Sequence, residues 1–276
     1  MTDRVVVVPT YPAHFYQTEL TLRSVIQHMD TVEKIIVIAD NISNLAWPDY
    51  LQDCADVYKP YHVQIIPAST ISVANQFRQV PWVRQQMVKL HLDQIIEPAE
   101  WLLIDGDTQL NTAPPATGRF CNRTPYQGIS LDIRDPQPGE KTSQMIFYVR
   151  QVMKDRYSGF QDHEGKSITA SHPPIHRMSA EVLESLRSHV SKQHSRSFVA
   201  LHLDIALDDR YSVTEWDLIE WYSRQYLDLS DHWLFDQSWF CSTWSCDREL
   251  GQAWFVEQAL EIDPAIWTRL PLAKYL

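Results

Sequence analysis

The first part of the chain alternates short apolar runs with longer stretches in which apolar residues recur at helical spacing. The apolar runs, each rich in Val, Ile or Leu, lie at residues 5–8, 34–39, 63–66 and 101–104. Runs without polar alternation are typical of strands buried on both faces of a sheet. Helical spacing occurs at residues 17–28, with Leu20 and Val25 as candidate core positions, and at residues 82–96. Strands separated by helices predict βαβ units and a parallel sheet.

The pattern becomes less regular beyond Asn111. Pro114, Pro115 and Gly118 mark a boundary or a long loop. The elements predicted after it are strands at residues 128–131 and 144–149 and helices at residues 179–192, 214–227 and 247–261.

This organisation predicts an α/β fold in a single domain over residues 1–276. Residues 1–113 would form a Rossmann-like, mostly parallel sheet flanked by helices, and residues 114–276 a less regular C-terminal half. No internal repeat or low-complexity segment interrupts the pattern.

The composition is acidic, with 24 Lys and Arg against 35 Asp and Glu and a net charge of −11. Proteins that bind nucleic-acid backbones usually carry a basic patch, so we expect no nucleic-acid partner. No stretch approaches the ~18 apolar residues of a membrane span, and the apolar run before Pro9 is too short for a signal sequence. The four cysteines show no CxxC spacing. We therefore expect a cytoplasmic protein, with a peripheral position at the inner membrane face as the alternative.

Two acids follow the last apolar run, in the sequence WLLIDGD. Asp105 and Asp107 are separated only by Gly106 and come directly after the predicted strand at residues 101–104. Open α/β sheets bind ligands at the carboxyl ends of their strands. Two carboxylates and a diphosphate make the all-oxygen environment that Mg²⁺ or Mn²⁺ prefers. The pattern predicts a divalent cation site, and the structural alternative is a tight turn, for which Asp-Gly is a common signal.

The predicted helix before this motif carries three polar residues that can share one face. Gln85 and Gln86 lie four and three residues before Lys89. An amide and an ammonium on one face could contact the base and phosphates of a nucleotide. The alternative is a solvated helix face.

The segments VVVVPTY, IIVIAD, WVRQQMVKL and LLIDGD together resemble the GT-A class of nucleotide-sugar glycosyltransferases. The similarity is to little-characterised bacterial members associated with surface glycans, and it covers residues 4–110 best. In that class the motif equivalent to Asp105–Asp107 binds a divalent metal on a sugar nucleotide. The resemblance implies contacts to the nucleotide sugar from residues at the ends of the predicted strands, namely Pro9, Thr10, Tyr11, Asp40, Asp105 and Gly106.

A second candidate lies at the start of the predicted helix at residues 214–227. Thr214, followed three residues later by Asp217, fits a capping box, which gives Asp217 a structural role. Glu215 instead lies on the apolar stripe of the helix, which consists of Leu218, Ile219, Tyr222 and Tyr226. Partial burial would raise the pKa of Glu215 toward a value that suits a general base. Glu215 is therefore the candidate base, and the alternative is an acid that complements the helix dipole.

Eleven histidines offer further metal ligands. His232 follows Glu215 by 17 residues, and several inverting GT-A enzymes place a metal-binding histidine in a similar position after the base. The resemblance therefore makes His232 the candidate third ligand, with His172 as the second choice. The alternative is a histidine that only makes hydrogen bonds in the core or on the surface.

These observations predict a glycosyltransferase that uses Mn²⁺ or Mg²⁺ and moves a sugar from a nucleotide-diphosphate sugar, in the first place a UDP-sugar, to a glycan or lipid-linked saccharide. With Glu215 as the base the reaction would invert the anomeric carbon, and retention is the alternative. A sugar-nucleotide nucleotidyltransferase would normally carry a glycine-rich basic loop after the first strand, but residues 9–14 contain neither glycine nor lysine. A catalytically silent glycan- or nucleotide-binding module is the other alternative, and the intact acid motif argues against it.

Overall fold

The computed structural model describes the chain in fourteen segments. These are residues 5–10, 15–30, 32–40, 62–97, 100–106, 108–110, 119–120, 124–125, 141–155, 160–161, 167–169, 175–227, 233–234 and 240–242. The predicted strand at residues 128–131 and the predicted helix at residues 247–261 lie outside the described residues.

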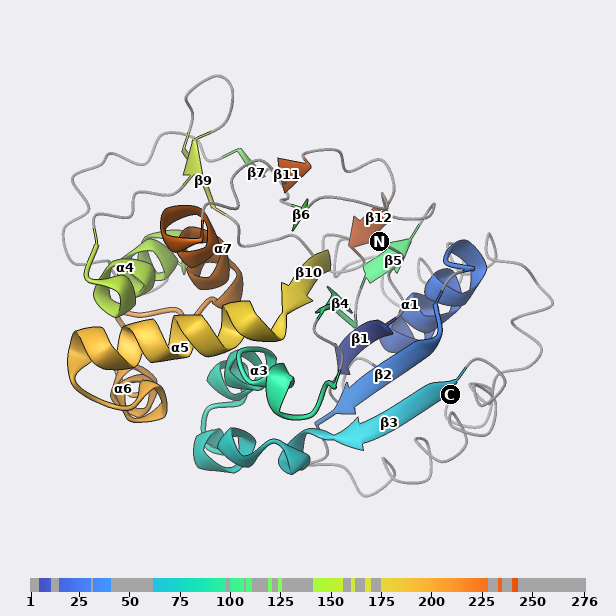
Figure 1. The fold of residues 1–276 in the computed structure, drawn as a ribbon, viewed down its shortest axis with the longest axis horizontal. Coiled ribbons are helices and arrows are strands. Elements are labelled where there is room, and N and C mark those ends of the chain that lie inside the picture. Colours follow the sequence, from blue (N-terminus) through green and yellow to red (C-terminus); the bar gives the residue numbers. More distant parts are fainter. Residues whose placement is uncertain are drawn as a thin grey trace.

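A five-stranded sheet in the order β10-β4-β1-β2-β3 forms the centre of the structure (Figure 1). Its strands are β1 (Val5–Thr10), β2 (Lys34–Ala39), β3 (Val63–Pro67), β4 (Glu100–Ile104) and β10 (Ile175–Ser179). β1 pairs in parallel with β2 and β4, and β2 pairs in parallel with β3. β10 pairs with β4 in the antiparallel direction. The predicted α/β fold with a mostly parallel sheet is therefore confirmed, and the antiparallel edge strand is an addition.

The apolar runs of β1, β2 and β4 form the centre of the sheet because both of its faces are covered there, whereas the residues of the edge strand β3 are half-buried or exposed. Val6 and Val8 of β1 pack with Leu22 and Val25 of α1 (Phe15–His28) on one face. Val5 and Val7 belong to the larger core on the other face, and that core also contains residues of α3 (Pro81–Lys89) and α5 (Ala180–His194). Successive strand residues point to opposite faces, so an uninterrupted apolar run supplies both cores.

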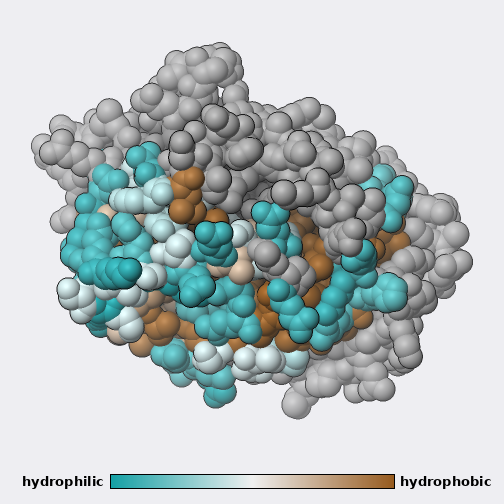
Figure 2. Space-filling view, in the orientation of Figure 1, coloured by the Kyte–Doolittle hydropathy of each residue, from teal (hydrophilic) through white to brown (hydrophobic). Residues whose placement is uncertain are grey.

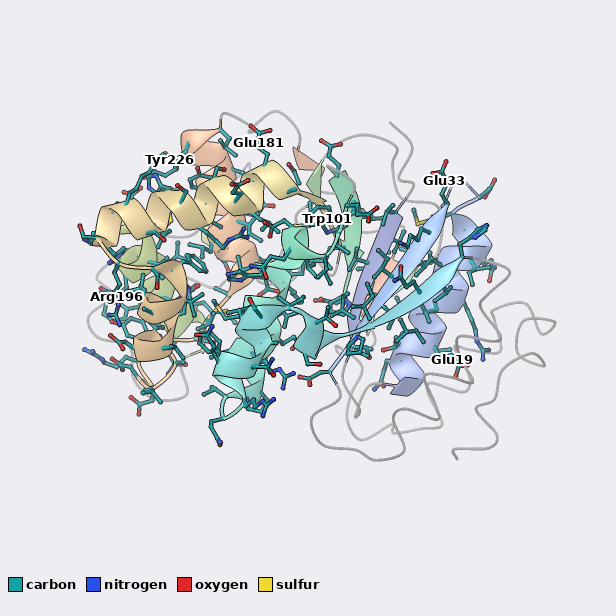
Figure 3. The ribbon with its side chains drawn as sticks, turned by 60° about the horizontal axis from the view of Figure 1, so that its bottom comes forward. Glu19, Glu33, Trp101, Glu181, Arg196 and Tyr226 are labelled. Atoms are coloured by element: carbon teal, nitrogen blue, oxygen red, sulfur yellow. The ribbon has the colours of Figure 1, made fainter. Side chains whose placement is uncertain are left out.

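Helices make up most of the described part of the C-terminal half. They are α4 (Lys141–Met153), α5, α6 (Phe198–Ile205) and α7 (Glu215–Tyr226). They gather beside the β10 edge of the sheet (Figure 1), where α5 packs against α6 and α7, and α4 packs against α7. Trp101 at the start of β4 is buried in the same core, where the sheet meets α5 (Figure 3).

Two of the predicted elements differ from the structure. Residues 144–149 lie within α4, so the strand predicted there is wrong. Ile146, Val149 and Met153 are buried at helical spacing, and a short apolar run does not by itself distinguish a strand from one turn of buried helix. The predicted helix at residues 82–96 is divided into α3 and a 3-10 turn, η5 (Leu92–Gln94).

The remaining elements are short. Two 3-10 turns, η3 (Ala68–Thr70) and η4 (Ser72–Phe77), connect β3 to α3. The short strands are β5 (Thr108–Leu110), β6 (Arg119–Phe120), β7 (Thr124–Pro125), β8 (Phe160–Gln161), β9 (Ser167–Thr169), β11 (Trp233–Leu234) and β12 (Phe240–Ser242). β12 pairs with β5, β11 pairs with β6, and β9 pairs with both β7 and β8.

The outer surface reflects the amphipathic helices that cover the core. On the face drawn in Figure 2 the described surface is mostly hydrophilic, with hydrophobic residues visible between the polar ones. Among the described residues, none of the helices combines the length and apolar character needed to cross a membrane.

Candidate functional site

Three of the predicted ligand-binding residues lie at one edge of the sheet, where β1, β2 and β4 end. Thr10 is the last residue of β1, Asp40 follows β2, and Asp105 follows β4. The backbone N–H of Asp40 donates to the carbonyl oxygen of Thr10 over 2.9 Å, which joins the first two strand ends. The side chains of Asp40 and Asp105 are 21% and 23% exposed, so each has part of its surface open. Two partly exposed carboxylates therefore lie at the carboxyl edge of a parallel sheet, where such folds bind ligands.

Gly106 brings the acid motif against the end of β1. A Cβ atom at this position would lie 2.7 Å from the carbonyl oxygen of Pro9 and 2.9 Å from Oγ1 of Thr18. Beside it, the hydroxyls of Thr10 and Thr18 share a hydrogen bond. Only glycine allows this approach without displacing the backbone of β1.

The Asp-Gly pair also makes a turn, as the structural alternative predicted. The N–H of Thr108, the first residue of β5, donates to the carbonyl oxygen of Asp105 over 3.0 Å. The turn and a ligand-binding role are compatible, because the turn engages the backbone of Asp105 and leaves its carboxylate to other partners.

Lys89 is the residue that connects this edge to the C-terminal half. Its Nζ lies 2.7 Å from Oδ1 of Asp105 and 2.6 Å from Oε1 of Glu215, and the Trp216 ring centroid is 4.6 Å away. The residue is 2% exposed, so the interpretation of a solvated helix face is wrong for Lys89. Burial by itself would lower the pKa of Lys89, but the two carboxylates outweigh it and raise the pKa above its usual value. Lys89 is therefore a buried cation, and its direct contact with a donor stays a prediction.

Glu215 lies on the other side of Lys89 and is 1% exposed. The side-chain amide of Gln86, with its nitrogen turned toward Glu215, donates to the carboxylate of Glu215 at both Oε1 and Oε2. Burial raises the pKa of Glu215, and the neighbouring Lys89 opposes the shift. The predicted desolvation of Glu215 is thus confirmed. A general base must reach the hydroxyl that it deprotonates, and the contacts of Glu215 are with Lys89 and Gln86, so the base role has no support from this arrangement.

The predictions for the two glutamines of α3 and for the N-terminus of α7 have separate outcomes. Gln86 is buried as part of the Glu215 contact, whereas Gln85 is half-buried. Thr214 is the N-cap residue of α7, as predicted, but its side chain makes no capping hydrogen bond to the helix backbone. Its hydroxyl instead donates to Oδ2 of Asp217 over 3.1 Å. Asp217 is buried, which agrees with a structural role for this acid.

Arg84 is a site residue that the sequence did not reveal. Its Nη2 lies 3.3 Å from Oδ1 of Asp40, and its side chain is almost completely buried. The signal for it was its position on the same helix as Lys89, five residues earlier. Each of the two partly exposed carboxylates is thereby paired with a basic residue of α3.

The predicted metal ligands are only partly within the described chain. Asp107, His172 and His232 lie outside the described residues, as does Tyr11, which was predicted as a contact of the nucleotide sugar. Within the described segments no group of three or more His, Cys, Asp or Glu side chains is arranged to hold a metal ion. Oδ1 of Asp105 is buried against Lys89, so the exposed part of the side chain lies away from that oxygen. Asp105 thus fits a divalent cation as a carboxylate ligand through its second oxygen, with Asp107 two residues further on.

No protein-family model matches the sequence, and no curated protein matches it either. Solved structures do match. The galactosyltransferase LgtC, in complex with donor and acceptor sugar analogues, is 12% identical over 94% of this chain and 96% of its own, with a TM-score of 0.48. Mouse xyloside xylosyltransferase 1 is 13% identical over 92% of this chain and 93% of its own, with a TM-score of 0.44.

A third match is the bifunctional glycosyltransferase WbbM, which is 11% identical over 85% of this chain, with a TM-score of 0.41. The chain spans only 39% of the WbbM chain. All three matches are glycosyltransferases, the class that the sequence resembles. Identities this low and TM-scores below 0.5 assign neither a substrate nor a mechanism to this chain.

Proposed function

We propose that this chain is a metal-dependent glycosyltransferase that transfers a sugar from a nucleotide-diphosphate sugar to a hydroxyl group of a glycan or lipid-linked saccharide. One observation carries the proposal. Asp40 and Asp105 lie partly exposed at the carboxyl edge of the parallel sheet, and each is held in place by a buried cation of α3. A structural ion pair alone gives no reason for the carboxylates to remain open at the edge where such sheets bind ligands.

Asp105 and Asp107 are the residues that would hold Mn²⁺ or Mg²⁺. A divalent cation in this place would neutralise the charge that develops on the departing diphosphate. Asp105 can serve in this way because Lys89 occupies only one of its carboxylate oxygens. His232, with His172 as the alternative, remains the proposed third ligand.

Thr10 and Asp40 would contact the nucleoside part of the donor, together with Pro9, Tyr11 and Gly106. The pairing of Asp40 with Arg84 supports this role, because an arginine partner holds the carboxylate in a fixed orientation. A ribose presents hydroxyl donors, which suit a fixed carboxylate acceptor. UDP-sugars are the first donors to test.

The acceptor would bind in the C-terminal half. Glu215 stays a candidate base only if an acceptor can reach its carboxylate. Its pairing with Lys89 gives no preference for inversion over retention. The anomeric configuration of the product, read by NMR, decides between these outcomes.

The direct experiment is a thermal-shift screen of nucleotide sugars with and without Mn²⁺. A ligand that binds only the folded state raises the melting temperature by mass action, so a true donor is expected to raise it in a Mn²⁺-dependent manner. Asp105→Asn should abolish the shift. Asp204→Asn, which removes an exposed acid on α6 that pairs with Arg196, should retain it and serves as the matched control.

Three further outcomes would contradict the proposal. Consumption of a nucleoside triphosphate together with a sugar phosphate would identify a nucleotidyltransferase. Donor binding without sugar transfer or hydrolysis, across a panel of acceptors, would identify a binding module. A shift of equal size in Asp105→Asn and the wild type would remove the site from this edge of the sheet.

A further inference from the structure

We infer that Glu215 is a positioning residue that controls the cation affinity of Asp105 by neutralising Lys89. This inference rests on the proposed function, since it assumes that Asp105 binds a divalent cation. It gives Glu215 a task that its buried contacts support, and that task differs from proton transfer.

The Lys89 ammonium group has three close partners. Oε1 of Glu215 at 2.6 Å and Oδ1 of Asp105 at 2.7 Å accept from it, and the ring of Trp216 faces it at 4.6 Å. These three partners match the three donors of an ammonium group. Lys89 is therefore fixed between two carboxylates and one aromatic ring.

The helix ends reinforce the same arrangement. Lys89 is the last residue of α3, and Glu215 is the first residue of α7. A cation is favoured at the C-terminus of a helix and an anion at the N-terminus. Both helices thus stabilise the charges that meet here, and Gln86 donates to Glu215 from within α3.

The net charge of Asp105, Lys89 and Glu215 determines how strongly Asp105 attracts a divalent cation. Asp105 and Lys89 alone form a pair without net charge, which would attract a divalent cation poorly and place an ammonium beside it. With Glu215 the three residues carry one net negative charge, and the ammonium is compensated from its far side. Because Lys89 and Glu215 are almost completely buried, solvent screens the interaction between them weakly. Glu215 thus favours cation binding at Asp105 without itself contacting the cation.

Glu215→Gln tests this step, because glutamine keeps the size of the side chain and removes its charge. The probe is Mn²⁺ alone, followed through the EPR signal of the free aqueous ion, and then Mn²⁺ with UDP. We expect Glu215→Gln to weaken Mn²⁺ binding by about tenfold or more. Asp217→Asn removes an equally buried acid from the first turn of the same helix and should stay within about threefold of the wild type.

The double variant Lys89→Met with Glu215→Gln separates positioning from a merely structural role. It has the same net charge as the wild type and lacks the ammonium that Glu215 compensates. We expect its Mn²⁺ affinity to return to within about threefold of the wild type, since the two residues act through one interaction. If Glu215→Gln alone does not fold, the double variant carries the test by the same criterion.

The outcomes that overturn the inference are distinct from those that overturn the proposed function. Unchanged Mn²⁺ affinity in Glu215→Gln, or a double variant as weak as the single one, overturns the role of Glu215 and leaves the cation site intact. No Mn²⁺ binding by the wild type, with or without UDP, overturns the cation site and the inference with it.

Discussion

Nη2 of Arg84 lies 3.3 Å from Oδ1 of Asp40, so that a buried cation of α3 pairs with the acid that follows β2. Five residues further along α3, Lys89 pairs with Asp105, the acid that follows β4. One helix therefore fixes both acids of the proposed donor site. Two strand ends that are separated in the sheet by β1 obtain a common support, which sets their relative positions before any ligand binds.

Replacing Arg84 should weaken donor binding more than it lowers the stability of the fold. Arg84→Met keeps the length and apolar stem of the side chain and removes a guanidinium whose Nε and Nη1 make no hydrogen bond. Because a buried charge with few partners contributes little net stability, we expect the free energy of unfolding to change by less than about 1.5 kcal/mol. Donor affinity should fall about tenfold, since Asp40 loses its support. Urea unfolding and calorimetric titration with UDP measure the two effects.

A loss of several kcal/mol with unchanged UDP affinity would make the Arg84–Asp40 pair purely structural. Arg78→Met is the matched control, because it removes an exposed arginine from the turn that precedes α3. Within the described chain, the side chain of Arg78 donates a hydrogen bond to Asn75. The substitution should change neither quantity measurably.

The fold could be predicted largely from the apolar runs, because strands buried on both faces need apolar residues at every position. All six residues of β1 are buried, for example. The edge strand β10 escaped prediction because its sequence, IHRMS, has no such run. Helix α6 follows α5 after only three residues, Ser195 to Ser197, and no breaker marked the division. The end of α5 could be recognised only from the left-handed backbone of its C-cap residue, Ser195.

The site could be predicted only where strand ends determine it. Thr10, Asp40 and Asp105 meet because parallel strands end at one edge, which follows from the sequence pattern alone. The ion pair of Lys89 and Glu215 joins residues 126 positions apart, and no local spacing relates them. Helical spacing placed Lys89 on a face with Gln85 and Gln86 but could not say that α7 covers this face.

Gly106 should tolerate no side chain. Gly106→Ala would place a Cβ atom 2.7 Å from the carbonyl oxygen of Pro9, and that oxygen belongs to the backbone of the central strand. We expect the free energy of unfolding to fall by about 2–4 kcal/mol. The folded fraction of Gly106→Ala should also lose the Mn²⁺-dependent binding of UDP. Urea unfolding and thermal shift with UDP provide the measurements, and wild-type behaviour in both would mean that the turn can move away from β1.

The buried pair Glu19 and Arg23 on α1 should make stability depend on pH. Burial raises the pKa of Glu19 from 4.5 to about 7, although Arg23 opposes the shift. The folded state therefore holds this proton more tightly than the unfolded state, so its contribution is present at pH 4.5 and below and is lost as the pH rises toward 7. We expect wild-type stability to contain a decline of up to about 3 kcal/mol over this range. Glu19 lies on α1 (Figure 3), one residue after Thr18, whose hydroxyl shares a hydrogen bond with Thr10.

Glu19→Gln removes the titrating group and should remove this decline. Urea unfolding at a series of pH values between 4.5 and 7.5 gives the comparison. Glu33→Gln, an exposed acid near the start of β2, is the control and should retain the wild-type dependence. Equal slopes in Glu19→Gln and the wild type would show that Glu19 ionises without cost in the folded protein.

Lys89 should be the residue of the site whose loss destabilises the protein most. Lys89→Met keeps the apolar stem but leaves Glu215, which is 1% exposed, without the cation that lies 2.6 Å away. A buried carboxylate without its partner costs about 3–5 kcal/mol, because its desolvation is no longer compensated. Adding Glu215→Gln removes that charge, so the double variant should recover to within about 1–2 kcal/mol of the wild type. Urea unfolding of the wild type, both single variants and the double variant completes the cycle. A double variant whose loss equals the sum of the single losses would mean that the two residues stabilise the protein independently, and that the contact between α3 and α7 contributes nothing through its charges.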